Sequence, residues 1–356
     1  MGPGPEVTVL MPVYNGASFL PEAIESILRQ TFRDFEFLII DDGSLDDSCS
    51  IVERYGDPRI RLLKNATNLG IVARLNQGFR CARGKYIARM DCDDISLPAR
   101  LQKQYDYMEA HPDVRVCGTW IDCFGELKER WRYPLEHREI ACRILFSSPI
   151  GHATAMFRRQ LLGEQHACYA EDFPCAEDYE LWSRLCLVTQ LANLGEVLYR
   201  YRRHRAQSVI RDRARQTESA ARVQRRLFER LGLLPTEDEL RLHAWAVRGG
   251  LAPSREGLGR LDSWFVKLVR ANQKTGRHQE ELLMKVVLHY WWKACWLLSG
   301  DMETWSLFRT GEVYRIAPRL NRSFKSVLLG MKNVYSAADR AVRRKAGDPA
   351  VDSEER

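Results

Sequence analysis

Three aspartates within four residues form a candidate metal-binding cluster, which we call the acidic cluster: Asp91, Asp93 and Asp94. They follow the apolar segment Tyr86–Met90, which predicts a strand. Carboxylates packed this closely raise each other's pKa unless a cation is present. Aspartate and water oxygens suit hard ions such as Mg²⁺, which often adds substrate phosphates to its shell. The cluster predicts a metal–diphosphate site, with a solvated acidic turn that caps a helix at Ser96 as the alternative.

Two further strand patterns end in residues that could bind a ligand. The apolar runs Val7–Val13 and Phe35–Asp41 alternate with helical patterns, which predicts an α/β fold with a mostly parallel sheet and right-handed crossovers. Ligands of such sheets bind beyond the carboxyl ends of the strands. An aromatic ring, a carboxylate pair and a metal-type cluster on one rim would suit a nucleotide diphosphate. The residues expected there, besides the acidic cluster, are Pro12, Val13, Tyr14, Asp41 and Asp42.

A second acidic pair, Glu177 and Asp178, opens the helical pattern Ala176–Leu185. A carboxylate at this position could accept a proton from a substrate hydroxyl group. Acidic residues also favour the first turn of any helix, so a structural role is an equal alternative. The preceding polar segment Gly163–Ala176 has no hydrophobic period and predicts a long loop that covers or shapes a site.

The composition indicates a folded protein. With 356 residues, 45% of them hydrophobic, the chain can form one large domain or two, and global disorder is excluded. Ten scattered cysteines without a C-x-x-C pair indicate reduced, packing thiols. The N-terminus shows no charged segment followed by an apolar core, so we expect a cytoplasmic protein.

The net charge of +7 is concentrated in one segment. Between Arg200 and Arg230 there are eleven arginines against three acidic residues, so the rest of the chain is close to neutral. Such a segment could meet an anionic membrane surface or nucleic acid, and lipid is the better match of the two. A solvated helix face is an equal alternative to both.

From about residue 210 the pattern becomes almost entirely helical. Its most apolar run, Leu283–Leu298, has sixteen residues and one polar stripe. A bilayer span needs about 20 apolar residues, so we expect a helix packed on its neighbours, with a membrane interface as the weaker alternative. The expected parts are an α/β domain at 1–209, a helical domain at 210–346 and a disordered tail at 347–356.

Over about residues 7–208 an ordered set of stretches resembles the family 2 glycosyltransferases, nucleotide-sugar-dependent enzymes with the GT-A fold. VLMPVYNGASFLPEAIESILRQTF resembles the opening strand and helix, and FEFLIIDDGSLDD resembles the nucleotide loop after the second strand. NLGIVARLNQGFRCARGKYIARMDCDD contains the D-x-D stretch. SPIGHATAMFRR, AEDYELWSRL and YRYRRHRAQS resemble the acceptor-side blocks.

For the donor, a nucleotide-diphosphate sugar, the resemblance implies roles position by position. Pro12 and Tyr14 lie against the nucleoside, flanking Val13. Asp42, with Asp41 beside it, reaches the edge of the base.

For the diphosphate, the resemblance implies a D-x-D pair at Asp91 and Asp93. Asp93 or Asp94 holds Mn²⁺ or Mg²⁺, and His204 lies near the metal. Arg202 could add to the positive field around the phosphates, although a solvated surface arginine is an equal alternative.

For the acceptor, the resemblance implies Asp178 as the general base, with Glu177 beside it. Attack opposite the leaving group would invert the anomeric carbon. The chain lacks the Q-x-x-R-W motif and membrane spans of the processive synthases, so we expect transfer of one sugar. Because products of the family often sit on lipid carriers or cell-surface glycans, the resemblance implies a glycan or lipid-linked acceptor in cell-surface polysaccharide synthesis. We expect the protein to act at the inner face of the plasma membrane and to bind no nucleic acid.

Two other functions stay open on the residues alone. A sugar nucleotidyltransferase would favour a glycine-rich loop with a basic residue after the first strand, and Tyr14–Ala17 does not supply one. A non-catalytic module could bind nucleotides or anionic lipid through the arginine-rich segment. The chain lacks the G-x-G-x-x-G fingerprint of dinucleotide dehydrogenases. Gly78–Tyr86 is not a P-loop, because five residues separate its glycines where a P-loop has four.

Overall fold

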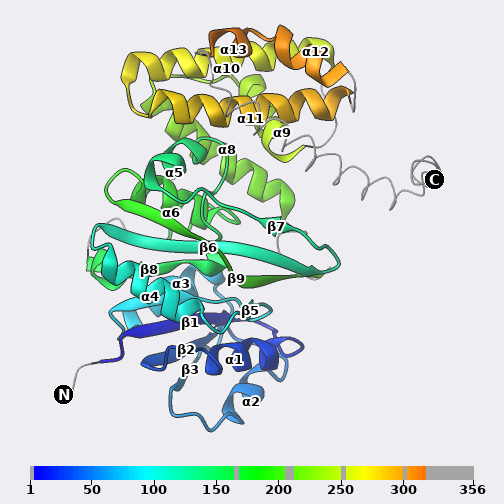
Figure 1. The fold of residues 1–356 in the computed structure, drawn as a ribbon. Coiled ribbons are helices and arrows are strands. Elements are labelled where there is room, and N and C mark those ends of the chain that lie inside the picture. The colour runs from blue at the N-terminus through cyan, green and yellow to red at the C-terminus, as the bar shows by residue number, and fades with distance from the viewer. Residues whose placement is uncertain (1–3, 164–167, 205–211, 250–253, 300–302, 318–356) are drawn as a thin grey trace, which may run out of the picture.

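The computed structural model describes residues 4–163, 168–204, 212–249, 254–299 and 303–317. The described residues up to 204 form a sheet half, and those from 212 to 317 form a helical half at the opposite end of the molecule (Figure 1). The sheet has nine strands in the order β3-β2-β1-β4-β8-β6-β9-β5, with β7 paired to β6. The strands are β1 Val7–Val13, β2 Phe35–Asp41, β3 Ile60–Lys64, β4 Tyr86–Arg89, β5 Ile95–Ser96, β6 Val114–Gly125, β7 Arg130–Trp131, β8 Met156–Arg158 and β9 Gln190–Arg203.

The first four strands of the sheet confirm the parallel arrangement that the alternating pattern predicts. Strand β1 pairs in parallel with β2 and β4, and β2 pairs in parallel with β3. The carboxyl ends at Val13, Asp41 and Arg89 therefore lie on one edge of the sheet. The antiparallel pairs of β8, β7 and β5 were not predicted, because those strands have only two or three residues each.

Helices cover both faces of these parallel strands. On β1, alternate side chains from Val7 to Val13 pack with α1 (Leu20–Leu28) and α4 (Arg100–Ala110), whereas Leu10 packs with α3 (Ile71–Cys81) on the other face. Helix α3 lies very close to β1, since a Cβ atom added at Gly78 would lie 2.3 Å from Leu10 Cδ1. The strand ends are thus held rigidly from both sides.

Three segments differ from what their sequence patterns alone suggest. The alternative of a helix cap at Ser96 is wrong, because Ser96 pairs with Tyr199 in β9 and is held extended, and α4 begins only at Arg100. The segment 136–146 has a helical pattern, but the helix is limited to α5 (His137–Arg143). The segment 152–159 has a strand pattern, but it begins with a 3₁₀ turn, η1 (His152–Thr154), and only β8 is extended. A second 3₁₀ turn, η2 (Arg159–Gly163), follows β8.

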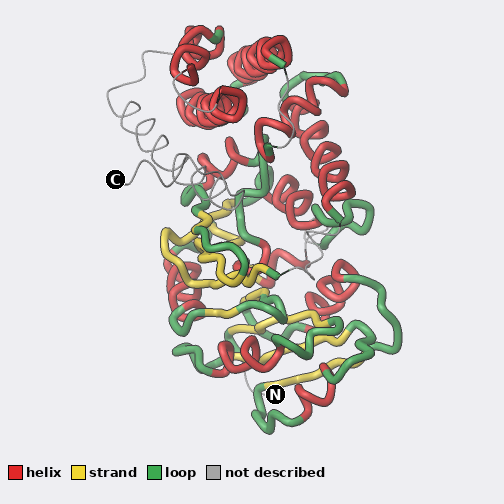
Figure 2. Tube along the Cα trace, turned by 90° about the vertical axis from the view of Figure 1, so that its right-hand side faces the viewer, coloured by secondary structure: helices red, strands yellow, loops and turns green. Residues whose placement is uncertain are grey.

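The helices of the helical half stack at one end of the sheet half (Figure 2). One continuous apolar core joins the two halves and includes residues of α5, α6 (Glu177–Leu185) and Trp264. In the helical half, α9 (Glu237–Arg248) begins with a capping box between Thr236 and Glu239. The predicted domain boundary near 210 and the tail 347–356 lie outside the described residues. Among the described helices, none has the length and apolar content needed to cross a bilayer.

The remaining helices are α2 Ser48–Glu53, α6 Glu177–Leu185, α8 Arg213–Arg230, α9 Glu237–Arg248, α10 Arg255–Thr275, α11 Glu280–Ser299, α12 Glu303–Thr310 and α13 Glu312–Ile316.

Candidate active site

The acidic cluster lies just beyond the end of β4, and its carboxylates converge. One oxygen from each of Asp91, Asp93 and Asp94 lies within 4.8 Å of the others. Asp94 is fully buried, and its Oδ1 accepts a hydrogen bond from the Arg202 backbone N–H at 2.7 Å. Burial, and then Asp93 and Asp91, raise the pKa of Asp94 well above its usual range. The alternative of a solvated acidic turn is therefore wrong.

The cluster has the chemistry of a hard-cation site. Asp94 Oδ2 is buried without a hydrogen-bond partner, which leaves a carboxylate oxygen that a cation would satisfy. His204 Nε2 lies 3.0 Å from Asp93 Oδ2, so an imidazole adjoins the carboxylates. Three carboxylates and one imidazole nitrogen are ligands that Mn²⁺ and Mg²⁺ sites use. The residues present fit the predicted metal.

Arg202 connects the acidic cluster to β9 and to α1. Its Nε donates to the Asp93 backbone carbonyl at 2.8 Å, and its guanidinium pairs with Glu22 and lies over the Phe19 ring at 4.7 Å. These contacts fix the loop that carries the cluster. The predicted contribution of Arg202 to a phosphate field stays a prediction.

Arg89, which the sequence analysis did not single out, is the central cation of the site. It is only 3% exposed, and its two terminal nitrogens bind the carboxylate of Asp91 at 2.7 and 2.8 Å. Its charge also lowers the pKa of Glu177 and of Asp178 against the effect of burial. Arg89 therefore acts electrostatically on both predicted groups of carboxylates. An arginine inside an otherwise apolar strand was the signal that could have revealed it.

The acidic pair at the start of α6 adjoins the acidic cluster. Burial, and then Asp178, raise the pKa of Glu177 to about 7, and Asp91 contributes to the same shift. Glu177 is 8% exposed, with His152 Nδ1 3.8 Å from its Oε1. Asp178 is half-buried, accepts a hydrogen bond from Ser148 Oγ at 2.9 Å, and has a pKa raised by burial. The structure thus brings the two groups of carboxylates to one place.

The predicted nucleoside side begins at the end of β1. Tyr14 is 47% exposed, so its ring is available to a ligand, while Pro12 is half-buried. The Val13 side chain is buried, and its carbonyl accepts the Asp42 N–H at 2.8 Å. Asp41 uses its carboxylate to accept the N–H groups of the following turn. These contacts order the loop after β2.

Asp42 has partners within the protein on both carboxylate oxygens. It is 3% exposed, accepts the N–H groups of Leu69 and Gly70 at 2.9 Å each, and pairs with Arg74 Nε at 2.5 Å. This bonding ties the end of β2 to the start of α3. The neighbouring Gly43 has φ +74°, and a Cβ atom there would lie 2.9 Å from the Thr67 backbone. The role of Asp42 at the base edge stays a prediction, and Arg74 was not foreseen from the sequence.

Comparison with known protein sequences identifies the family of the chain. Residues 8–165 match the family model described as "Glycosyl transferase family 2". An uncharacterized glycosyltransferase of Haemophilus influenzae is 34% identical over 62% of this chain and 72% of its own length. The O-antigen biosynthesis glycosyltransferase WbnJ of Escherichia coli is 34% identical over 56% of this chain and 80% of its own length.

Comparison with solved structures shows a shared fold. The crystal structure of Staphylococcus aureus TarS 1–349 in complex with UDP-GlcNAc gives a TM-score of 0.56 at 16% identity, over 83% of this chain and 92% of that one. The mannosyltransferase PcManGT of Pyrobaculum calidifontis, in complex with GDP-Man and Mn²⁺, gives 0.50 at 18% identity, over 96% and 88%.

Proposed function

This chain belongs to glycosyl transferase family 2, and we propose that it transfers one sugar from a nucleotide-diphosphate sugar to a hydroxyl group of a glycan or lipid-linked acceptor. The observation that carries the proposal is a buried arginine, Arg89, which pairs with Asp91 of the acidic cluster at 2.7 Å and also acts electrostatically on Glu177 and Asp178, so that it links two groups of carboxylates. One group suits a metal-bound diphosphate, and the other suits a base. The relative named for O-antigen biosynthesis supports a role in cell-surface polysaccharide synthesis.

On the donor side, Asp93, Asp94 and His204 would hold Mn²⁺ or Mg²⁺. The ion, when bound, neutralises charge that develops on the departing diphosphate. The exposed ring of Tyr14 offers a face for the nucleobase. A fold shared with a mannosyltransferase that binds GDP-Man and Mn²⁺ supports this assignment.

On the acceptor side, Asp178 takes the proton of the attacking hydroxyl group. Its raised pKa makes the ionised carboxylate a stronger base, and Arg89 keeps it available in the ionised form. The acceptor oxygen bonds to the anomeric carbon as the bond to the diphosphate breaks. Attack opposite the leaving group inverts that carbon without a covalent intermediate. Glu177, with a pKa of about 7, is the second candidate for the proton.

A binding and turnover experiment tests the proposal. Calorimetry with a panel of UDP-, dTDP- and GDP-sugars, with and without Mn²⁺, should find one metal-dependent donor. Release of its nucleoside diphosphate should follow on addition of acceptor glycans, and NMR of the product should show an inverted anomeric carbon. Absence of binding across the panel would refute the donor assignment, and retained configuration would refute the single displacement.

We also propose that the arginine-rich segment contacts an anionic membrane surface from the cytoplasmic side. Part of its charge is neutralised internally, since Arg222 pairs with Asp172 and Arg226 approaches Glu180 at 3.8 Å. Flotation with anionic vesicles, against neutral vesicles as control, tests the contact. Failure to float with either would remove it.

A further inference from the structure

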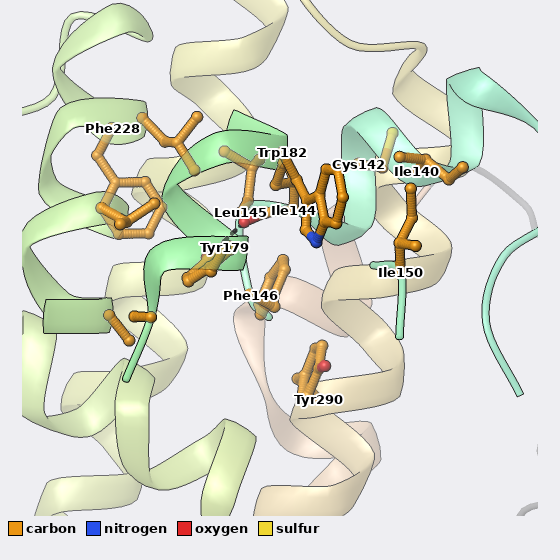
Figure 3. Close-up of a cluster of buried hydrophobic side chains, with 14 of the residues drawn as sticks. Ile140, Cys142, Ile144, Leu145, Phe146, Ile150, Tyr179, Trp182, Phe228 and Tyr290 are labelled. Carbon is orange, nitrogen blue, oxygen red and sulfur yellow. Dashed lines mark hydrogen bonds between the residues drawn. The ribbon is translucent and has the colours of Figure 1, made fainter. Parts of the chain in front are cut away.

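The turn Ile144–Ser148 lies where α6 meets the helical half, with Ile144, Leu145 and Phe146 near Tyr179 of α6 (Figure 3). Its backbone carbonyls are held by three buried side chains. From α6, the Tyr179 hydroxyl donates to the Ile144 carbonyl at 2.5 Å. From α9, His243 Nε2 lies 3.0 Å from the Leu145 carbonyl, and from α8, Gln224 Nε2 donates to the Phe146 carbonyl at 2.8 Å. Two of the three partners therefore come from the helical half.

Ring packing fixes the same turn from the side of α11. The Phe146 ring stacks on Tyr290 (Figure 3), with 4.4 Å between centroids and 7° between planes. It also stacks on His243, with 4.7 Å between centroids. His243 is itself held, because its Nδ1 accepts a hydrogen bond from Trp264 Nε1 at 3.2 Å. A displacement of the turn would thus disturb the core of the helical half.

The turn ends at Ser148, whose hydroxyl group contacts the proposed base. Ser148 Oγ lies 2.9 Å from Asp178 Oδ2 and 3.1 Å from the Ile150 carbonyl. The single hydroxyl proton is drawn more strongly to the carboxylate, because a charged acceptor makes the stronger hydrogen bond. The position of the turn therefore determines which carboxylate oxygen is held and in which direction the other one points.

We propose that the helical half positions Asp178 through this turn, with Ser148 as a positioning residue. The proposal rests on the proposed function, because it presumes that Asp178 accepts a proton. Gln224 and His243 hold the turn, the turn places Ser148, and Ser148 orients the carboxylate. The helical half thereby controls the rate of the chemical step and leaves donor binding unchanged.

A matched pair of buried variants tests the connection. Gln224→Met removes the donor to the Phe146 carbonyl, whereas Asn272→Leu removes comparable bonds to His278 within the helical half, away from the turn. For hydrolysis of UDP-GlcNAc or GDP-mannose with Mn²⁺, Gln224→Met should lower kcat about tenfold at unchanged donor Kd. Asn272→Leu should leave kcat unchanged at a similar loss of Tm. Equal kcat losses in both variants would overturn the proposal.

Ser148→Ala is the second test, because it deletes one hydroxyl group and should fold. It should lower kcat about 10- to 100-fold and move the acidic limb of the pH–kcat profile upward, since the Ser148 hydrogen bond lowers the pKa of Asp178. Ser148→Thr should restore both. The ionisable groups that face Asp178 are unaltered in these variants: Arg89, Glu177, Tyr133, Tyr169 and Tyr179. If the acidic limb of the pH–kcat profile of Ser148→Ala stays at the wild-type pH, Ser148 has only a structural role.

A readout without turnover separates this proposal from the proposed function. The carboxyl titration of Asp178 can be followed by carbon-13 NMR of labelled aspartate, assigned with Asp178→Asn. Wild-type protein that neither binds nor hydrolyses a sugar nucleotide would refute the proposed function alone. Titration curves of Gln224→Met and Ser148→Ala identical to wild type would refute the positioning.

Discussion

His243 and Lys293 of the helical half and Asp94 of the sheet half are buried ionisable side chains with opposite hydrogen-bonding states. In the helical half, burial lowers the pKa of His243 to about 3, and both ring nitrogens of this neutral histidine have partners. Burial also lowers the pKa of Lys293 to about 8, and its Nζ donates to the Val247 carbonyl. In the sheet half, burial and neighbouring carboxylates raise the pKa of Asp94, whose Oδ2 has no partner.

This difference separates groups that serve the fold from groups that serve a ligand. A buried polar group that stabilises a protein is satisfied within the chain, whereas an unsatisfied one lowers stability until a ligand offsets it. Arg89 neutralises only part of the charge beside it. A divalent cation should therefore stabilise the sheet half, and the helical half should be indifferent to it.

The largest expected effect comes from the proposed base. Asp178→Asn should lower sugar transfer about 10²- to 10⁴-fold, because the attacking hydroxyl group loses its proton acceptor. Donor affinity should stay near the wild-type value. Nucleoside diphosphate release and calorimetry measure the two quantities, with the exposed Asp172→Asn as control. Wild-type activity in Asp178→Asn would remove this residue as the base.

The next effect concerns the donor and separates the two groups of carboxylates. Asp93→Ala should lower Mn²⁺-dependent donor affinity about 100-fold, because the cation loses a ligand. Calorimetry with and without Mn²⁺ checks this, with the exposed Asp106→Ala as control. Donor affinity that ignores both the metal and the mutation would mean that the acidic cluster serves the fold alone.

Asp94→Asn tests whether the sheet half carries a stability cost. Its raised pKa means that the folded state holds the proton more tightly than the unfolded state, so stability falls as the pH rises and the carboxyl group ionises. Without metal, Asp94→Asn should increase the free energy of unfolding at pH 7, because the variant has no carboxyl group to ionise in the buried site. Urea denaturation measures this, and the variant should lose the stabilisation by Mn²⁺. If Asp94→Asn is less stable than wild type without metal, Asp94 carries no stability cost and the contrast between the two halves is wrong.

The last effect concerns the helical half and has the opposite pH dependence. The folded pKa of His243 lies below the unfolded value of about 6.5, so the unfolded state binds more protons and stability falls as the pH decreases from there towards 3. In this range, protonation of His243 should lower the free energy of unfolding by about 1.4 kcal/mol for each pH unit. His243→Gln should remove it, and the exposed His111→Gln should not. Equal pH slopes of urea-derived stability in all three proteins would show that His243 is not buried as a neutral ring.

Local patterns predicted much of the fold because each strand and helix is specified by its own few residues. The runs at β1 and β2 have continuous apolar character, and the structure places both in the buried sheet. Short elements failed, since two residues such as Ile95 and Ser96 become a strand only by pairing with β9. The helical character of the region after 210 was also foreseen, although no motif indicated what it does.

The sequence by itself determined which ionisable residues reach the rim, because parallel strands place their carboxyl ends on one edge. Only the tertiary structure decided their partners. Asp94 bonds to a residue 108 positions away, and Ser148 to one 30 positions away. Burial and the charge of Arg89 act on the pKa of Asp91 and of Glu177, and neither effect exists until the chain has folded. The aspartates could therefore be found by their spacing and Arg89 by its place in an apolar strand, while Arg74 and Ser148 could be found only by their contacts.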